Sequence, residues 1–129
     1  MRNEDSVVIE LRLGVVSIVL PGDIGHEAEQ ILTPRLATAP ITIVKAPHHG
    51  SATSSSEPFV AATHPSAVIF SAGRNNRFGH PAPVVVARYL SADCAVFRTD
   101  EDGAIVLDTD GQVVRITTWA SGRRVTLRR

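Results

Sequence analysis

The sequence contains a single cysteine, Cys94, which excludes a disulfide bond within the chain. The apolar neighbours of this residue in CAVF predict that it is buried as a small hydrophobic side chain. No apolar run approaches the roughly 18 residues that a membrane-spanning helix needs, and MRNEDSVV at the N-terminus lacks the basic and apolar regions of a signal peptide. We therefore expect a soluble chain that makes no membrane contact of its own.

An excess of charge of one sign is also lacking, because thirteen basic and thirteen acidic side chains give a formal net charge of zero. No overall field therefore favours a nucleic acid as a partner. Arginine suits bidentate phosphate recognition better than lysine does, whereas the alternative interpretation is a solvated edge strand with a charged tail. Twelve of the thirteen basic residues are arginine, and four of them crowd the C-terminus: Arg123, Arg124, Arg128 and Arg129.

Several signatures of known sites are missing as well. The chain has no pair of cysteines for a zinc ribbon, no glycine-rich phosphate loop of the P-loop kind and no G-x-S-x-G nucleophile motif. The acidic segments DEDG (100–103) and DTDG (108–111) lack the long loop and terminal glutamate of a calcium site, so they are predicted to be hairpin turns. With 129 residues, of which 43% are hydrophobic, the chain is expected to form one domain over 1–129.

What the sequence does contain is an alternation of strand-like and helix-like segments. Apolar residues at helical spacing from Ile24 to Leu36 predict a helix that Pro34 ends or distorts. The order of segments predicts an α/β fold with a mixed sheet, about three helices and C-terminal antiparallel strands. The predicted elements are a hairpin over 6–20, a helix over 24–36, a strand over 41–46, a helix over 57–63, a strand over 66–72, a helix over 83–90, and four closing strands over 94–99, 103–109, 112–119 and 123–128.

Polar side chains directly follow three of the predicted strands. Asp23 comes after the hairpin, His48 and His49 come after the next strand, and the loop RNNRFGH over 74–80 comes after the strand that follows. If those strands are parallel neighbours, their carboxyl ends meet at one edge of the sheet. Open α/β sheets place their ligand sites at this edge.

Each of these positions has two interpretations. Asp23, at the start of a helix, is either an N-terminal helix cap or a metal ligand. His48 and His49 are either incidental polar residues or functional ones, since imidazole binds metals such as zinc and serves as a general acid or base near neutral pH. Adjacent residues of a strand point to opposite faces, so at most one of the two histidines is expected to enter a given site.

The loop RNNRFGH is rich in hydrogen-bond donors. Arg74, Asn75, Asn76 and Arg77 can donate to a phosphate, with His80 as a proton donor or oxyanion stabiliser. The alternative is a loop held together by asparagine side chains that bond to nearby backbone. Both interpretations remain open from the sequence.

Taken together, these segments resemble a known family. VVIELRLGVVSIVLPGDIG, ITIVKAPHHGSATSSSEPF, AVIFSAGRNNRFGHP and VFRTDEDGAIVL occur in the order found in the C-terminal half of the metallo-β-lactamase fold. More narrowly, the chain is similar to the soluble hydrolase domain of ComEC-type DNA-internalisation competence proteins. The resemblance covers about residues 3–108, and the last hairpin, from Gln112 onward, lies outside it.

The resemblance implies roles for the residues at the sheet edge. Asp23 resembles the metal-bridging aspartate of the family and His49 a terminal ligand, so the implied cofactor is a divalent metal, zinc or manganese. His80 and His48 are the implied catalytic side chains. Sites of this family use a metal pair to activate water for attack on a phosphodiester, which implies DNA or another phosphodiester as substrate. The implied substrate-binding residues are Ser51, Arg74, Asn75 and Asn76.

The family's first metal motif, His-x-His-x-Asp-His, has no counterpart in this sequence. A zinc ion takes about four ligands, which Asp23 and one or two histidines do not provide. Half of an αββα sandwich also leaves the apolar inner face of its sheet bare. We therefore expect the chain to form a homodimer or to pair with a separate N-terminal half-domain, and to be a weak or inactive phosphodiesterase or nuclease of DNA uptake when alone.

Two other functions stay open. One is a non-catalytic binding or assembly module on a degenerate metallo-β-lactamase scaffold, either as a monomer or as a homodimer. The other is a mononuclear hydrolase that uses Asp23 and both histidines of the pair, which requires a kinked strand end at Pro47. Related domains belong to bacterial membrane proteins while this sequence has no predicted span, so no compartment is assigned.

Overall fold

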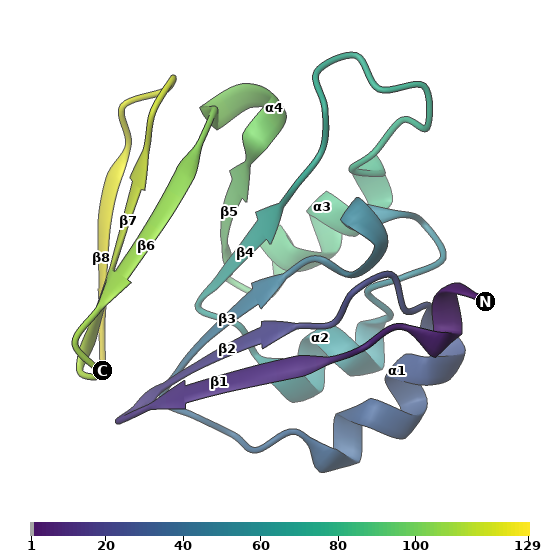
Figure 1. The fold of residues 1–129 in the computed structure, drawn as a ribbon, viewed down its shortest axis with the longest axis horizontal. Helices are drawn as coiled ribbons and strands as arrows, with labels where there is room; N and C mark the ends of the chain where they lie inside the picture. Colours follow the sequence, from purple (N-terminus) through teal and green to yellow (C-terminus); the bar gives the residue numbers. More distant parts are fainter. Residues whose placement is uncertain (1) are drawn as a thin grey trace.

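The computed structural model describes residues 2–129. The first part of the chain forms a five-stranded sheet made of β1 (Ile9–Leu13), β2 (Val16–Leu20), β3 (Ile41–Lys45), β4 (Ala67–Phe70) and β5 (Ala95–Arg98). These strands lie across the sheet in sequence order (Figure 1). β1 and β2 form the predicted antiparallel hairpin, and the other neighbours are parallel. The predicted mixed sheet is therefore confirmed.

Three helices cover one face of this sheet (Figure 1). They are α1 (His26–Leu32), α2 (Glu57–Thr63) and α3 (Pro83–Ser91), and each follows one strand and precedes a parallel neighbour. α1 ends at Leu32 and continues as a short 3₁₀ segment, η2 (Thr33–Arg35), so Pro34 ends the α-helix as predicted. Phe59, Phe70 and Tyr89 are fully buried between the helices and the sheet.

The chain closes with a second, antiparallel sheet of three strands. Its strands are β6 (Ile105–Thr109), β7 (Val113–Thr118) and β8 (Arg124–Arg128). This sheet packs on the face of the five-stranded sheet that the helices leave free (Figure 1). Val114 and Ile116 are fully buried there, in one cluster with Phe97. The parallel sheet thus lies between two cores, which gives the molecule three layers.

Two details of the predicted C-terminal region are wrong. The predicted strand over 94–99 becomes β5, which joins the parallel sheet and not the closing antiparallel strands. DEDG over 100–103 is not a hairpin turn, because the strands on either side of it belong to different sheets. It forms most of the single helical turn α4 (Thr99–Asp102). The buried Asp102 carboxylate accepts a hydrogen bond from the Arg98 backbone N–H at 2.8 Å, which stabilises this turn.

An ion pair ties the second sheet to the first. Arg123, just before β8, lies 3.3 Å from Asp102 Oδ2, donates to a backbone carbonyl of β5 at 2.9 Å and stands 4.1 Å above the centroid of the Phe97 ring. Burial alone raises the pKa of the carboxyl group, but hydrogen bonds from Arg98, Ser121 and Arg123 lower it overall. Arg123 is therefore engaged within the fold and is not among the arginines available to a phosphate.

The inner face of the five-stranded sheet, expected to be bare, is covered over its centre by the second sheet. Only the edge strand β1 stays open. Ile9, Leu11 and Leu13 pair with residues of β2 whose inner face is covered, yet they are 47%, 52% and 54% exposed. We call these three residues the β1 stripe. The expectation of a wholly bare face is wrong, because the C-terminal hairpins fold back over it.

Two expectations from composition can be compared with the structure directly. Cys94 is buried in the core between the helices and the sheet, as its neighbours predict, and burial raises the pKa of its thiol to about 12. Within residues 2–129, no helix has the length and the apolar character needed to cross a membrane.

Candidate functional site

The two adjacent histidines lie in a left-handed turn and not on a strand. β3 ends at Lys45, and the following segment η3 (Pro47–Gly50) is a tight turn in which φ is 48° at His48 and 56° at His49. Histidine is among the residues that enter this region, at a cost of order 1–3 kcal/mol each. The premise of the opposite-face prediction is wrong, because the strand ends at Lys45, before both histidines. Their ring centroids lie 6.5 Å apart.

Gly50 completes this turn with a φ of 84°. A Cβ atom at this position would lie 2.6 Å from Phe70 Cδ1 and 2.7 Å from Pro81 Cβ. Only glycine therefore fits between β4 and the end of the RNNRFGH loop. The backbone N–H of His48 also donates to the Gly22 carbonyl at 3.0 Å, which fixes the turn against the segment that carries Asp23.

His49 and Asp23 face each other across this junction. His49 Nε2 lies 3.5 Å from Asp23 Oδ1, and each side chain is 44% exposed. On the other side of the ring, His49 Nδ1 lies 2.7 Å from the Ser71 carbonyl oxygen. Because a carbonyl oxygen only accepts, Nδ1 carries the hydrogen, and Nε2 of the neutral ring turns its lone pair toward Asp23. Metal-binding histidines are commonly held in this way by a carbonyl on the second ring nitrogen.

The distance between these two atoms suits a shared metal ion. Two ligands that each lie about 2.1 Å from a tetrahedral zinc ion are roughly 3.4 Å apart, close to the separation of Nε2 and Oδ1. Imidazole and carboxylate also suit manganese. Within residues 2–129, no group of three histidine, cysteine, aspartate or glutamate residues could hold a metal. Asp23 and His49 thus fit as two ligands of a divalent ion without completing its shell, and they form an ion pair when His49 is protonated.

His48 and His80 lie beside this pair. Their rings are nearly perpendicular, at 74°, with centroids 5.7 Å apart, and the Asn3 side-chain nitrogen lies 3.4 Å from His48 Nε2. Partial burial, followed by the positive charges that His48 and His49 can carry, lowers the pKa of His80. His80 is therefore largely uncharged at pH 7. The structure brings the three histidines and Asp23 together at the carboxyl edge of the parallel strands.

Asn76 closes the RNNRFGH loop. Its side-chain nitrogen donates to the His80 carbonyl at 2.6 Å, and its Oδ1 accepts from the His80 backbone N–H at 3.0 Å. These bonds to nearby backbone are the second interpretation that the sequence left open for the asparagines of this loop. Through them, Asn76 positions His80. Phe78 adds to this support by stacking on the His80 ring, with centroids 5.7 Å apart.

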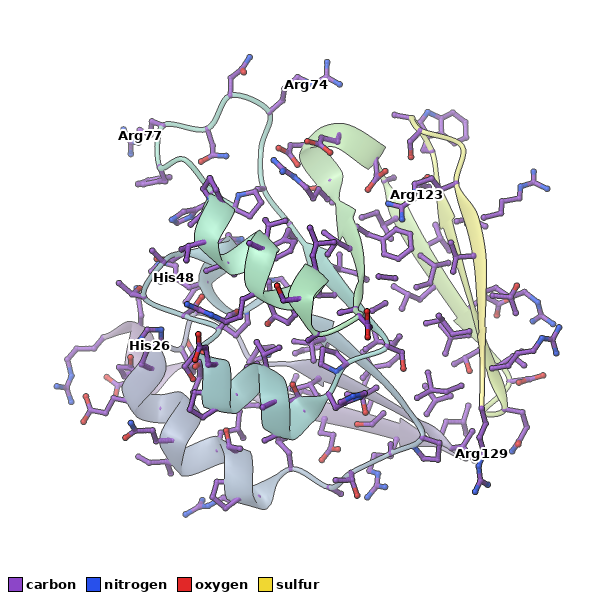
Figure 2. All side chains as sticks on the ribbon, turned by 180° about the vertical axis from the view of Figure 1, so that it is seen from behind. His26, His48, Arg74, Arg77, Arg123 and Arg129 are labelled. Atoms are coloured by element: carbon purple, nitrogen blue, oxygen red, sulfur yellow. The ribbon has the colours of Figure 1, made fainter. Side chains whose placement is uncertain are left out.

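The other candidate substrate contacts lie in different surroundings. Arg74 and Asn75 are exposed at the outer part of the loop, and Figure 2 shows Arg74 and Arg77 pointing away from the body of the molecule. They stand where a ligand can approach from solvent. Ser51 is buried, and its Oγ lies 2.9 Å from Thr53 Oγ1, so its hydroxyl supports the loop from within.

The alternative role of Asp23 as a helix cap is wrong. The N-cap residue of α1 is Gly25, and no side-chain hydrogen bond from that residue caps the helix. Glu4 of the N-terminal segment η1 (Asn3–Asp5) takes this role instead, since its Oε1 accepts from Gly25 N–H at 2.9 Å and its Oε2 from Ala28 N–H at 2.8 Å. The carboxylate of Asp23 is left to face His49.

A buried acidic residue that the sequence did not single out supports the loop that follows η3, the turn that carries His48 and His49 (the histidine turn). Glu29 is 1% exposed, and its carboxylate accepts hydrogen bonds from the backbone N–H groups of Ser55 and Ser56, the second at 2.9 Å. From α3, the Tyr89 hydroxyl lies 2.9 Å from Ser55 Oγ, and Arg88 donates to the Ser55 carbonyl. Ser55 has a φ of 54°, so this network holds a further left-handed residue in place. A glutamate within a helical pattern gives no sequence signal for such a role.

Lys45 is the second residue left unassigned by the sequence. It is the last residue of β3 and is half-buried beside the histidine turn. Burial lowers the pKa of its ammonium group, while the Asp23 carboxylate opposes that shift. Lys45 therefore adds positive charge near Asp23. The sequence could have drawn attention to Lys45, because it is the one lysine among thirteen basic residues.

Known proteins that are similar to this chain are much longer than it. No protein-family model matches the chain. It is 35% identical to ComE operon protein 3 of Bacillus subtilis over 104 residues, which are 81% of this chain and 13% of that protein. It is 30% identical to competence protein ComA of Neisseria gonorrhoeae over 104 residues, 80% of this chain and 15% of that protein. It is 34% identical to recombination protein 2 of Haemophilus influenzae over 103 residues, 80% of this chain and 13% of that protein.

These similarities extend over four fifths of the chain, which includes most of the fold described above. They support the expected resemblance to competence proteins. The matched segments make up 13–15% of the three relatives, so what the chain shares with each of them is one segment of a longer protein. Through that segment, the chain is similar to proteins that include competence protein ComA.

Proposed function

We propose that this chain supplies the second half of a metal-dependent phosphodiesterase or nuclease site of the metallo-β-lactamase type, within a protein of DNA uptake. The observation that carries the proposal is the Asp23–His49 pair, whose Oδ1 and Nε2 atoms lie 3.5 Å apart while Ser71 holds the other ring nitrogen. The layer of helices on the five-stranded sheet (Figure 1) agrees with half of such a sandwich. The similarity to competence proteins supports DNA as the substrate.

Each residue of the cluster has a role in this proposal. Asp23 and His49 hold a zinc or manganese ion, which supplies positive charge and Lewis acidity beside a phosphodiester. His80, largely uncharged at pH 7, donates a hydrogen bond from its neutral ring to a phosphate oxygen and so stabilises the negative charge there, and His48 orients the substrate phosphate. Arg74 contributes a charge-assisted hydrogen bond from the exposed loop.

The remaining metal ligands come from outside this chain. Asp23 and His49 provide two of the about four donors that zinc needs. The β1 stripe offers an apolar surface on the same sheet, and its occupant in our proposal is another segment of the same protein, because the matched segments are 13–15% of the relatives. Alone, the chain is weak or inactive. Analytical ultracentrifugation tests the other occupant, a second copy of the chain, which would appear as a dimer that Leu11→Glu dissociates.

A non-catalytic binding or assembly module is the second candidate. The observation that favours it is the lack, within residues 2–129, of any group of three potential metal ligands. In that case Asp23 and His49 form only an ion pair. The edge of the sheet that carries Asp23 and the three histidines, which we call the histidine edge, then serves as a binding surface. Metal affinity separates the two candidates.

Isothermal titration calorimetry with zinc and with manganese provides this test. We expect micromolar binding that weakens at least about tenfold in Asp23→Asn and in His49→Asn, since each removes one of two ligands. Asparagine is used at position 49 because it tolerates the φ of 56° there. The matched controls are Asp108→Asn and His64→Asn, two exposed residues outside the cluster, of which His64 also has a positive φ.

Equal metal affinity in the site variants and in the controls would rule out the metal site and leave the assembly module. Activity is measured on a longer form of the protein that carries the missing ligands, as cleavage of labelled DNA with added manganese. Asp23→Asn should abolish that cleavage. Cleavage that persists in this variant would contradict the assignment of Asp23 as a ligand.

A further inference from the structure

The outer face of the three-stranded sheet is not used by the proposed site. Along β7, Val114 and Ile116 turn inward, while Arg115 and Thr117 turn outward. The same alternation continues along β8, where Val125 packs inward. Residues paired across antiparallel strands share a face, so the pairs Arg115–Thr126, Thr117–Arg124 and Val113–Arg128 line up on the outside.

Trp119, just after β7, is left in water at 87% exposure, the highest among the large apolar side chains of residues 2–129. It is also the single tryptophan of the chain. Together with Arg115 and Arg124 it lines a shallow groove on the outer face. An isolated, fully exposed indole contributes nothing to the core, so its flat ring is available to a ligand with an aromatic face.

The charge of this face is positive. Within residues 2–129, Arg115, Arg124 and Arg128 form no ion pair, in contrast to Arg123, which turns inward. Asp108 is the acidic residue that the strand pairing places opposite Arg115. Figure 2 shows nitrogen-tipped side chains projecting from this sheet on the side away from the five-stranded sheet. Because Arg124 and Arg128 are four residues apart on one strand, their Cα atoms lie about 13 Å apart, enough to reach different phosphates.

We propose that the outer face of β6–β8 binds single-stranded nucleic acid, with Arg115, Arg124 and Arg128 on the phosphates and Trp119 stacked on a base. A basic groove beside an exposed aromatic ring suits a single strand, whose bases offer their faces without being read for sequence. A duplex keeps those faces stacked inside. An anionic membrane is a poorer match, because within residues 2–129 this face exposes only two large apolar side chains, Val106 and Trp119, and interfacial binding needs buried apolar area.

The β7–β8 turn and the RNNRFGH loop lie toward the same end of the molecule (Figure 2). In Figure 2, Arg123, which marks the β7–β8 turn, and Arg74 and Arg77, which mark the RNNRFGH loop, lie at the same end of the molecule. The inference rests on the proposed function only in preferring nucleic acid to other polyanions, since binding requires neither Asp23 nor a metal.

The intrinsic fluorescence of Trp119 reports binding without a label. The 129-residue chain is titrated at low salt with oligo(dT) of about 12 nucleotides, in the range of site sizes on such surfaces, with EDTA present throughout. We expect saturable quenching of the emission, because a stacked base lies against the only indole of the chain. Emission that does not change would overturn the proposal.

Anisotropy of a fluorescein-labelled oligo(dT) measures the variants. Trp119→Ala should weaken binding about 5- to 160-fold, the range for loss of one base stack, and Trp119→Phe should keep most of the affinity. The double variant Arg124→Gln/Arg128→Gln should lower the slope of log affinity against log salt by about 1.4, because each contacted phosphate of a single strand contributes about 0.7. Its matched control is Arg12→Gln/Arg35→Gln, with the same change of charge at exposed positions on other elements.

Equal losses in the two arginine double variants, an unchanged affinity in Trp119→Ala, or tighter binding to duplex DNA or to phosphatidylserine vesicles would each overturn the proposal. The failure of this inference is distinguishable from failure of the proposed function. Asp23→Asn should bind oligo(dT) like the wild type while losing metal, whereas Trp119→Ala should keep metal binding. Thermal unfolding of the Trp119, Arg124/Arg128 and Arg12/Arg35 variants should agree with that of the wild type, because these substituted side chains are exposed.

Discussion

The histidine edge and the outer face of the second sheet are built in opposite ways. At the edge, three consecutive residues have positive φ, and buried polar side chains such as Glu29 and Tyr89 hold the surrounding loop. On the outer face, regular strands present arginine and threonine at every second position without any such support. Irregular backbone brings a few side chains to fixed short distances, as a metal requires. Regular strands repeat charges at even spacing, as a polymer requires.

This difference also predicts which region tolerates substitution. The left-handed residues of the edge cost free energy that the rest of the fold offsets through buried hydrogen bonds. The outer face stores no strain, and its side chains are solvated. Single substitutions should therefore unfold or distort the edge, while the outer face should lose binding and keep its stability.

Glu29→Ala should have the largest effect on stability. It leaves the backbone N–H groups of Ser55 and Ser56 without their acceptor, at about 1–3 kcal/mol each, so the free energy of unfolding should fall by about 2–6 kcal/mol. Urea denaturation measures this change. Glu27→Ala, at an exposed position of the same helix, is the control and should stay within about 0.5 kcal/mol. Similar losses in both variants would show that the buried network does not support the edge.

Gly50→Ala should have the next largest effect. The added Cβ meets Phe70 at 2.6 Å in a residue with a φ of 84°, so overpacking and backbone strain together should cost about 2–4 kcal/mol. Gly79→Ala separates the two terms, since Gly79 has a φ of 67° and nothing within 4 Å of its Cβ position. Denaturation curves should show that Gly79→Ala lowers the free energy of unfolding by about 1 kcal/mol. Equal costs would mean that Gly50 is needed for its backbone conformation alone.

Asp102→Asn tests how the two sheets are held together. Loss of the charged partner of Arg123 should lower the free energy of unfolding by about 1–2 kcal/mol at pH 7. The pKa of Asp102 is lower in the folded chain than in the unfolded one, so the carboxylate stabilises the fold above the unfolded pKa of about 4. This contribution is lost as the pH falls through the folded-state pKa. Denaturation at several pH values should show a constant gap to the wild type above about pH 4 and a shrinking gap below it; a gap that widens in acid would contradict this account.

Leu11→Thr should have the smallest effect. Leu11 is 52% exposed on the β1 stripe, so the free energy of unfolding should change by less than about 0.5 kcal/mol. Threonine is β-branched, which suits a strand, and it removes apolar surface. A larger loss in urea denaturation at low protein concentration would mean that the stripe is already covered within the folded chain.

The strands and helices were predictable from the sequence because their patterns are local. β-branched runs and Pro34 placed the elements to within a few residues. The assignment of β5 to the parallel sheet and the helical turn at DEDG were not predictable in this way. They depend on which distant strand a segment pairs with, and Asp102 reaches its partners only after both sheets have formed.

The site was predictable in part for the same reason. Topology places the ends of parallel strands together, so the gathering of Asp23, His48, His49 and the RNNRFGH loop followed from the strand order. The roles of Glu4 and Glu29 did not, since each carboxylate binds backbone more than twenty residues away in the sequence. A glutamate has the same local pattern whether it is solvated or buried.

The sequence by itself determined most of the strands and helices of this protein and the edge at which its polar residues meet, because hydrophobic periodicity and the order of elements are local properties of the chain. Only the tertiary structure decided that both histidines turn left-handed, that one of them faces Asp23 with its ring held by Ser71, and that the C-terminal hairpins cover the sheet while leaving Trp119 in water. These features depend on contacts between segments that are distant in sequence. Local propensity contains no information about such contacts until the fold brings the segments together.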